Sequence, residues 1–120
     1  MKYAALLFNT TEDWERWETL TPEEAAEARA EEMPRWEALF GFVGSRWTGG
    51  YELGDRADAK VVRVRDGETQ ISDGPFAETK EVIGGLAILD CENLDEAIEM
   101  AARVPLVERG AVELRPIVER

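Results

Sequence analysis

Histidine is absent from this chain of 120 residues, and cysteine occurs once. The missing imidazole excludes Ser-His and Cys-His catalytic pairs, His-Glu-x-x-His zinc sites and any histidine base. The single thiol, Cys91, excludes an intrachain disulfide and a zinc cluster built from cysteines. If the protein catalyses a reaction, carboxylate, lysine, tyrosine or arginine side chains must therefore carry it.

Long hydrophobic runs are also missing. No apolar segment approaches the ~20 residues of a membrane-spanning helix. The N-terminus passes from Met1-Lys2 directly into a short apolar run, without the features of a signal peptide. Together with the lack of paired cysteines, these absences predict a protein of the reducing cytoplasm with no membrane partner.

Basic residues are scarce, because 26 acidic side chains stand against 14 basic ones and the net charge is −12. Such a chain repels the phosphate backbone of nucleic acids at long range, so we expect no nucleic-acid partner. The acidity is otherwise a common means of keeping a protein soluble. The sequence also lacks a glycine-rich phosphate loop and a ligand set with metal-binding spacing, so we expect no cofactor and no metal ion.

The composition, with 44% hydrophobic and 33% charged residues, is that of one globular domain, which we expect to span residues 1–120. The dipeptide Asp66-Gly67 predicts a two-residue β-hairpin, because both positions tolerate a positive φ. Apolar runs and apolar–polar alternation predict the strands. These strands lie near residues 3–8, 44–53, 61–65, 68–72, 82–91 and 111–115.

Two capping patterns predict the main helices. Thr21 to Glu24 form a capping box with proline at the first helical position. The helix should run to about Phe40, be kinked or split at Pro34, and end at Gly41. Asn93 caps a second helix, which ends before Pro105.

The expected order is strand, helix, strand, hairpin, strand, helix, strand. Two main helices on one face of a mostly antiparallel sheet, with an extra β-hairpin, make an α+β sandwich. The strands near 3–8 and 82–91 are apolar on both sheet faces, whereas the helices can cover only one. A second copy of the chain is the simplest cover for the other face, so we expect a homodimer.

The most informative stretch runs from Asp73 to Glu81, with the sequence Asp-Gly-Pro-Phe-Ala-Glu-Thr-Lys-Glu, and Gly84-Gly85 follows it. Asp73, Gly74 and Pro75 make a rigid turn, which holds neighbouring side chains in fixed geometry. The side chains that could line a pocket come next: Phe76, Glu78 and Lys80. The alternative is a well-built surface turn in which Lys80 pairs with an acid.

Three further residues are candidates for a binding site. Arg63 and Arg65 alternate with valines, so both project from one strand face. They form either an anion clamp for carboxylate or phosphate, or the solvated side of the hairpin. Gly85 allows a β-bulge or the close approach of a ligand, and the packing of another backbone would require it equally.

The motif from Asp73 to Glu81, with the following Gly84-Gly85, resembles the DGPF group of the YCII-related family. Other segments are similar to the same family: Met1–Tyr3, Leu20–Glu24, Val62–Gly67, Asn93–Ala97 and Val112–Pro116. The resemblance implies a ferredoxin-like fold that forms a dimeric α/β barrel. It also implies a cleft lined by the motif loop, related in shape to muconolactone isomerase-like enzymes.

The resemblance leads to two hypotheses of function. In the first, the dimer barrel binds a small, anionic molecule, with isomerase- or lyase-like chemistry as its enzymatic form. Asp73 would be the acid/base or hydrogen-bond acceptor, Arg63 and Lys80 would orient the anion, and Phe76 would form a wall. A His/Asp pair, implied for some members of the wider family, has no counterpart in a chain without histidine, so we place binding ahead of catalysis.

In the second hypothesis the protein is a non-catalytic interaction module. Genes of the DGPF group often lie beside extracytoplasmic-function sigma factors, so such a sigma factor is the implied partner. The motif loop would then be structural or would contact that partner. A purely structural dimer, with the loop packed at its interface, is the third interpretation.

Overall fold

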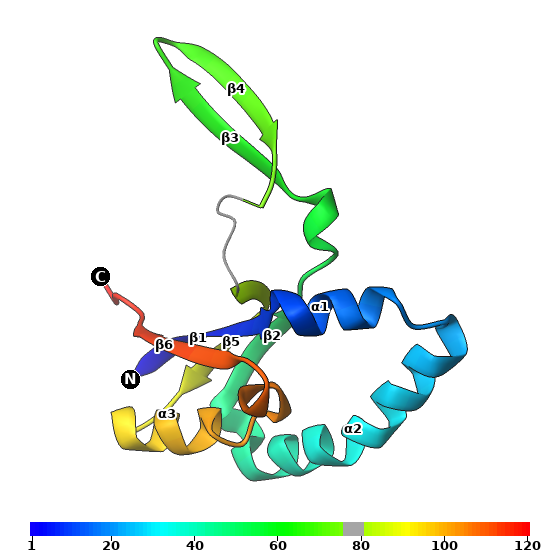
Figure 1. Ribbon diagram of the computed structural model, residues 1–120. Helices are drawn as coiled ribbons and strands as arrows, with labels where there is room; N and C mark the ends of the chain where they lie inside the picture. Colours follow the sequence, from blue (N-terminus) through cyan, green and yellow to red (C-terminus); the bar gives the residue numbers. More distant parts are fainter. Residues whose placement is uncertain (76–80) are drawn as a thin grey trace.

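The computed structural model describes residues 1–75 and 81–120, which form a small sandwich and a projecting hairpin (Figure 1). Strands and α-helices follow one another as β1 (Lys2–Thr10), α1 (Thr11–Glu18), α2 (Pro22–Val43), β2 (Trp47–Glu52), β3 (Lys60–Arg65), β4 (Glu68–Asp73), β5 (Glu81–Asp90), α3 (Leu94–Ala101) and β6 (Ala111–Pro116). Three short 3-10 turns, η1 (Gly44–Arg46), η2 (Arg56–Asp58) and η3 (Pro105–Glu108), connect them.

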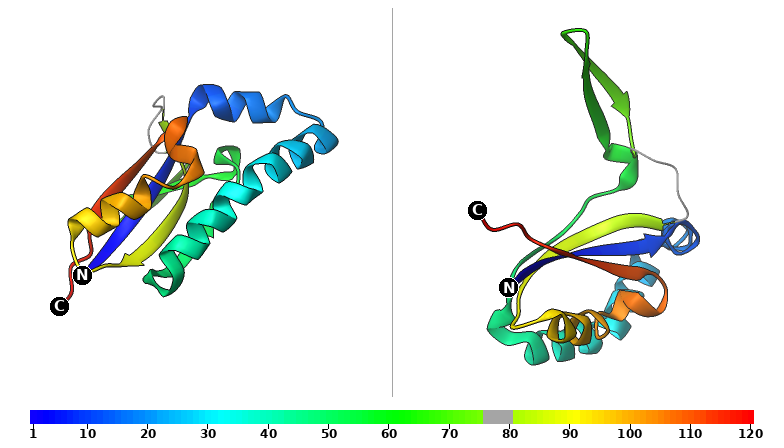
Figure 2. Two further views of the ribbon diagram at one scale, coloured as in Figure 1. Left: turned by 90° about the horizontal axis from the view of Figure 1, so that it is seen from below. Right: turned by 90° about the vertical axis from the view of Figure 1, so that its left-hand side faces the viewer.

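Four strands form one sheet in the order β2-β5-β1-β6, and every neighbouring pair is antiparallel. The two long strands β1 and β5 lie in the centre because they carry the longest apolar runs. Helices α2 and α3 both lie on one face of this sheet (Figure 2). The predicted α+β sandwich, with two main helices on one face, is therefore confirmed.

The core lies between this face and the two helices. Tyr3, Ala5 and Leu7 are alternate residues of β1, and all three side chains are buried in this core. Leu89 of β5 and Met100 of α3 complete the centre of this cluster and are almost fully buried. Burial of alternate strand residues is the signature of a sheet covered from one side.

Helix α2 begins as predicted and ends later than predicted. The capping box is present, with the Thr21 amide donating to the Glu24 carboxylate at 3.0 Å and the Glu24 amide donating to the Thr21 hydroxyl at 3.2 Å. The helix continues unbroken through Pro34 to Val43, because burial of Leu39 and Val43 outweighs the one amide donor that proline removes. Gly44, with a φ of 53°, ends the helix.

Gly41, the predicted end, lies inside α2, so that expectation and the split at Pro34 are wrong. None of the helices within residues 1–75 and 81–120 is long and apolar enough to cross a membrane.

The other face of the sheet carries apolar side chains, and no helix within residues 1–75 or 81–120 covers it (Figure 2). Cross-strand partners Leu6 and Leu86 project from this face, as do Phe8 and its partner Ile83. We call it the open face and define it by Ala4, Leu6, Phe8, Tyr51, Ile83, Leu86 and Ile88. Tyr51, on the edge strand β2, is the most accessible of these residues, with an exposed fraction of 72%.

Strands β3 and β4 form a separate two-stranded sheet that stands away from the sandwich (Figure 1). We call residues 60–73 the arm. Its turn is the predicted one, since Asp66 and Gly67 have φ values of 53° and 76°. The arm makes the molecule extended: its radius of gyration is 16.5 Å, whereas a compact domain of this length has about 14 Å.

Candidate functional site

The turn predicted as a site begins at the base of the arm. Asp73 is the last residue of β4, and its carboxylate forms an ion pair with Lys60, the first residue of β3. The amide of Gly74 donates to the carbonyl of Ala59 at 2.8 Å. A Cβ at Gly74 would lie 2.7 Å from the Cβ of Ala59, so glycine is required where the two chain segments meet.

Pro75 follows Gly74 through a cis peptide bond. The remaining motif residues proposed as pocket lining, Phe76, Glu78 and Lys80, lie outside the described residues. Asp73 itself is largely exposed, with 83% of its side chain accessible. Within one chain, the Asp73 carboxylate therefore pairs with Lys60 at the protein surface.

The arm has two different faces. Cross-strand pairing places Lys60 opposite Asp73 and Val62 opposite Ile71, so these side chains share one face. Arg63 lies opposite Gln70 and projects from the other face, as does Arg65 opposite Glu68. Within one chain, Asp73 and the two arginines therefore do not face each other, although the sequence grouped them in one site.

Gly85 lies in the central strand β5, between Leu7 of β1 and Glu52 of β2. A Cβ there would lie 3.1 Å from the carbonyl oxygen of Tyr51, which is a tight contact with the neighbouring strand. The register between β1 and β5 shifts beside it, since Leu7 pairs with Gly85 and Phe8 with Ile83. Gly84 is left as the extra residue of the irregularity, as expected for a β-bulge.

A polar cluster that sequence reasoning missed lies at the end of β1. Asp13 of α1 is only 7% exposed. Its Oδ1 accepts hydrogen bonds from Arg16 Nη2 at 2.9 Å and Nε at 3.2 Å, and its Oδ2 accepts from Arg109 Nε at 3.2 Å. Arg109 Nη2 also donates to Glu32 of α2 at 3.1 Å. The cluster thus ties α1, α2 and the segment after η3 together.

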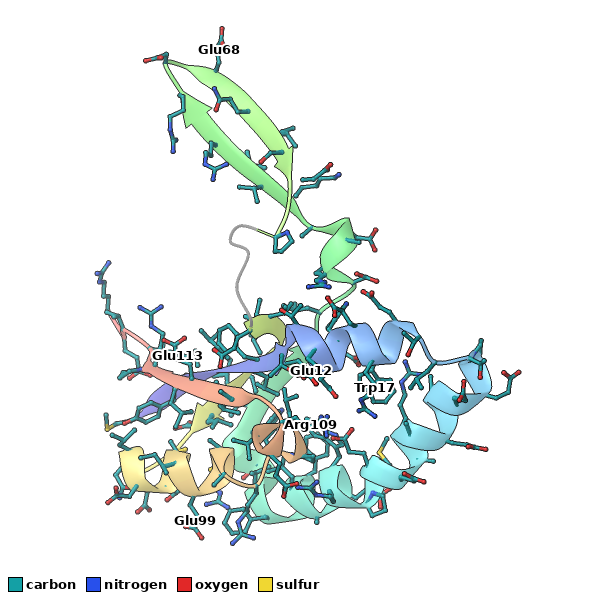
Figure 3. All side chains as sticks on the ribbon, viewed as in Figure 1. Glu12, Trp17, Glu68, Glu99, Arg109 and Glu113 are labelled. Atoms are coloured by element: carbon teal, nitrogen blue, oxygen red, sulfur yellow. The ribbon has the colours of Figure 1, made fainter. Side chains whose placement is uncertain are left out.

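A shallow depression of about 200 Å³ adjoins this cluster and is lined by Thr10, Glu12, Asp13, Arg16 and Arg109. Figure 3 labels Glu12 on α1 and Arg109 on the segment after η3, the two sides of the depression. Both arginines already pair with carboxylates, so the depression offers no excess positive charge to a ligand.

The electrostatics of Asp13 favour a structural role. Burial acts to raise the pKa of this carboxyl, but hydrogen bonds from Asn9 and Arg16 and the charges of Arg109 and Arg16 outweigh burial and lower it. The group is therefore charged at neutral pH and unsuited to proton transfer there. The spacing of Asp13 and Arg16, three residues apart on a helix, was the only signal of the cluster in the sequence.

Three comparisons place the chain among known proteins. Residues 41–120 match the sequence model of the family described as YCII-related domain. A curated relative, "Uncharacterized protein R00369" of Rhizobium meliloti (strain 1021), is 43% identical over 61 residues. That match covers 49% of this chain and 49% of the relative, so it spans about half the length of each.

A solved structure shares the fold. It is described as "5-chloro-2-hydroxyhydroquinone dehydrochlorinase (TftG) from Burkholderia phenoliruptrix AC1100: Complex with 2,5-dihydroxybenzoquinone". The TM-score is 0.52, the identity is 13%, and the alignment covers 100% of this chain and 96% of that one. Together with the strand order, this similarity confirms the ferredoxin-like fold predicted from the sequence.

Proposed function

Because the chain belongs to the YCII-related family, we propose that it binds a small, anionic molecule in a cleft between two copies of its single domain. The observation that carries the proposal is the open face, which presents an apolar floor of Leu6, Phe8, Leu86 and Ile88. Ligand sites are concave and mostly apolar, with few polar groups at their margins. A flat floor becomes such a site when a second sheet closes over it.

The rows of side chains that cross the open face explain the choice of ligand. One row runs from Tyr51 through Leu86 and Leu6 to Glu113. The next row contains Ile88 and Ala4 and ends at Arg115. A molecule with an apolar body over the leucines would place its anionic group near the Arg115 guanidinium and a hydroxyl or carbonyl near Tyr51.

A solved structure and the residues of the arm also support the proposal. The TftG structure, which shares the fold, is described as a complex with 2,5-dihydroxybenzoquinone, a small oxygenated ring that suits such a floor. Asp73 at the base of the arm is the proposed hydrogen-bond acceptor, and Arg63 and Lys80 are the proposed cations that orient an anion. If a reaction of isomerase or lyase type takes place in this chain without histidine, we assign its proton transfer to the Asp73 carboxylate.

A titration of ¹⁵N-labelled protein with 2,5-dihydroxybenzoquinone and with benzoate tests this function. We expect amide shifts in residues 4–8 and 83–88. Asp73→Asn and Arg115→Ala should each weaken binding roughly tenfold, the usual cost of losing one charged hydrogen bond. Glu68→Gln and Arg120→Ala, which alter an exposed acid of the arm and an exposed base at the C-terminus, are the matched controls. Shifts that map elsewhere, or variants that bind like the controls, would contradict the proposal and favour the interaction-module hypothesis.

A further inference from the structure

The arm exposes an apolar face that is largely uncovered by the described residues of its own chain. Val62 is 62% exposed, Val64 is 59% exposed and Ile71 is 68% exposed. All three share the face that carries the Lys60–Asp73 pair at its base. Two-stranded hairpins are marginally stable alone, and an exposed apolar strand pair attracts another surface.

The arm and the open face lie on the same side of the molecule. In the right-hand view of Figure 2, α2 and α3 lie below the sheet and the arm rises from the opposite side. A molecule seated on the open face therefore stands beside the arm. Six-residue strands reach about 20 Å, which matches the width of a four-stranded sheet at ~4.8 Å per strand.

Charge favours a second copy as the occupant. Each copy carries a net charge of −12, so two copies repel each other at long range. The arm is an exception, because its three bases equal its three acids: Lys60, Arg63 and Arg65 against Asp66, Glu68 and Asp73. The open face is apolar apart from its margins. These two surfaces are where a second copy meets least repulsion.

The estimated interface areas also favour a second copy as the occupant of the open face. Strand spacing and rise give the open face a footprint of about 400 Å² and the arm about 200 Å². Two sheets alone would bury about 800 Å² in total, below the roughly 1,000 Å² expected of a specific interface. Each engaged arm adds about 200 Å² of its own surface and about 200 Å² of the surface it covers, so with both arms the total reaches about 1,600 Å², the standard size of a specific interface.

We propose that the arm is a clasp for a second copy of this chain. Val62, Val64 and Ile71 pack onto the copy that covers the open face, and the clasp rests on the face-to-face dimer proposed above. Packing of this side of the arm places the Lys60–Asp73 pair at the rim of the space between the two sheets. Each ligand cleft is then incomplete without the partner copy.

Sedimentation equilibrium of paired variants tests the clasp. Val62→Asp with Ile71→Asp puts two charges on the apolar side, whereas Gln70→Asp with Ser72→Asp puts two charges on the opposite side of the same arm. The first pair should weaken dimerisation roughly 100-fold, because two charges would be buried, and the second pair should leave it within about threefold. Equal behaviour of the two pairs, or a wild-type protein of single-chain mass, would overturn the clasp.

A mixed-label experiment identifies the surface that the arm contacts. Thr69→Cys places a spin label on the apolar side of the arm, while buried Cys91 stays unlabelled. Mixed with ¹⁵N-labelled wild-type chains, the labelled copy should broaden resonances of those chains. Wild-type resonances that stay sharp in the mixture would show an arm that contacts no second copy, and broadening seen only after adding a sigma factor would show a protein partner; either result overturns the clasp. Neither experiment uses a ligand. A dimeric wild type that binds no ligand would contradict the proposed function and leave the clasp standing, whereas equal behaviour of the two variant pairs in a dimeric protein would overturn the clasp alone.

Discussion

The two faces of the four-stranded sheet come from the same strands but differ in how they are covered. Tyr3, Ala5 and Leu7 of β1 are buried beneath α2 and α3, whereas Leu6 and Phe8 between and beside them lie on the open face. Both faces are apolar, so hydrophobicity alone does not distinguish them. One face stabilises the single chain, and the other is the face that we propose a second copy and a ligand cover.

The largest expected effect separates the faces directly. Leu89→Ala, in the covered core where the side chain is 1% exposed, should lower the free energy of unfolding by about 3 kcal/mol. Leu86→Ala, three residues earlier on the open face, should lower the stability of the single chain by about 1 kcal/mol or less, because within one chain its side chain is less buried. Urea unfolding at a protein concentration low enough to dissociate the dimer measures both. Equal losses would break the distinction between the faces.

A second prediction concerns close backbone packing at the edge of the sheet. A Cβ at Gly110 would overlap the carbonyl oxygen of Phe8, which must then shift. Gly110→Ala should therefore cost about 2–3 kcal/mol. Gly41→Ala is the control, because nothing lies within 4 Å of that Cβ inside helix α2, and it should stabilise by about 1 kcal/mol. An unchanged free energy of unfolding for Gly110→Ala would contradict the close contact between Gly110 and Phe8.

The Asp13 cluster gives a pH-dependent prediction. Asp13→Asn removes a buried carboxylate from two arginines and should cost about 2 kcal/mol at pH 7. The pKa of Asp13 is lowered in the folded state, so its contribution is present above its ordinary pKa and is lost as pH falls through the lowered value. The difference between wild type and variant should shrink below about pH 4.

Exposed Glu12, which lines the same depression, provides the matched control for that measurement. Glu12→Gln should leave the free energy of unfolding within about 0.5 kcal/mol of the wild type across the pH range. A difference for Asp13→Asn that is constant with pH would contradict the ion-pair interpretation.

The smallest effect is expected at the helix cap. Thr21→Ala removes the hydroxyl that accepts from the Glu24 amide, and the cost should be about 1 kcal/mol. Gln70→Ala, on the side of the arm opposite the clasp, should change the free energy of unfolding by less than about 0.5 kcal/mol. Thermal unfolding distinguishes the two. Equally small effects would mean that the capping box contributes nothing to the free energy of unfolding.

Sequence reasoning predicted most of the fold because the signals are local. The capping box at Thr21, the turn at Asp66-Gly67 and the apolar runs of β1 and β5 each act within a few residues. The predicted end of α2 was wrong because a contact distant in the sequence decides it. Val43 is buried in the core, and this tertiary contact stabilises α2 through Pro34 and beyond Gly41.

The candidate site was predictable only in part. Arg109 and Asp13 are 96 residues apart in the chain, so no local pattern links them. The alternation of valines in β3 indicated a strand but not that Val62 and Val64 stay exposed on a projecting arm. Convergence of Asp73, Arg63 and Lys80 on one ligand stays a prediction, because it depends on an assembled dimer and Lys80 lies outside the described residues.

The mass of the wild-type protein in solution tests the central claim most directly. If a second copy completes the open face, sedimentation equilibrium at micromolar concentration will give the mass of two chains of 13.5 kDa each. A mass of one chain across the concentration range would contradict the account, since the open face and the arm would then remain in water.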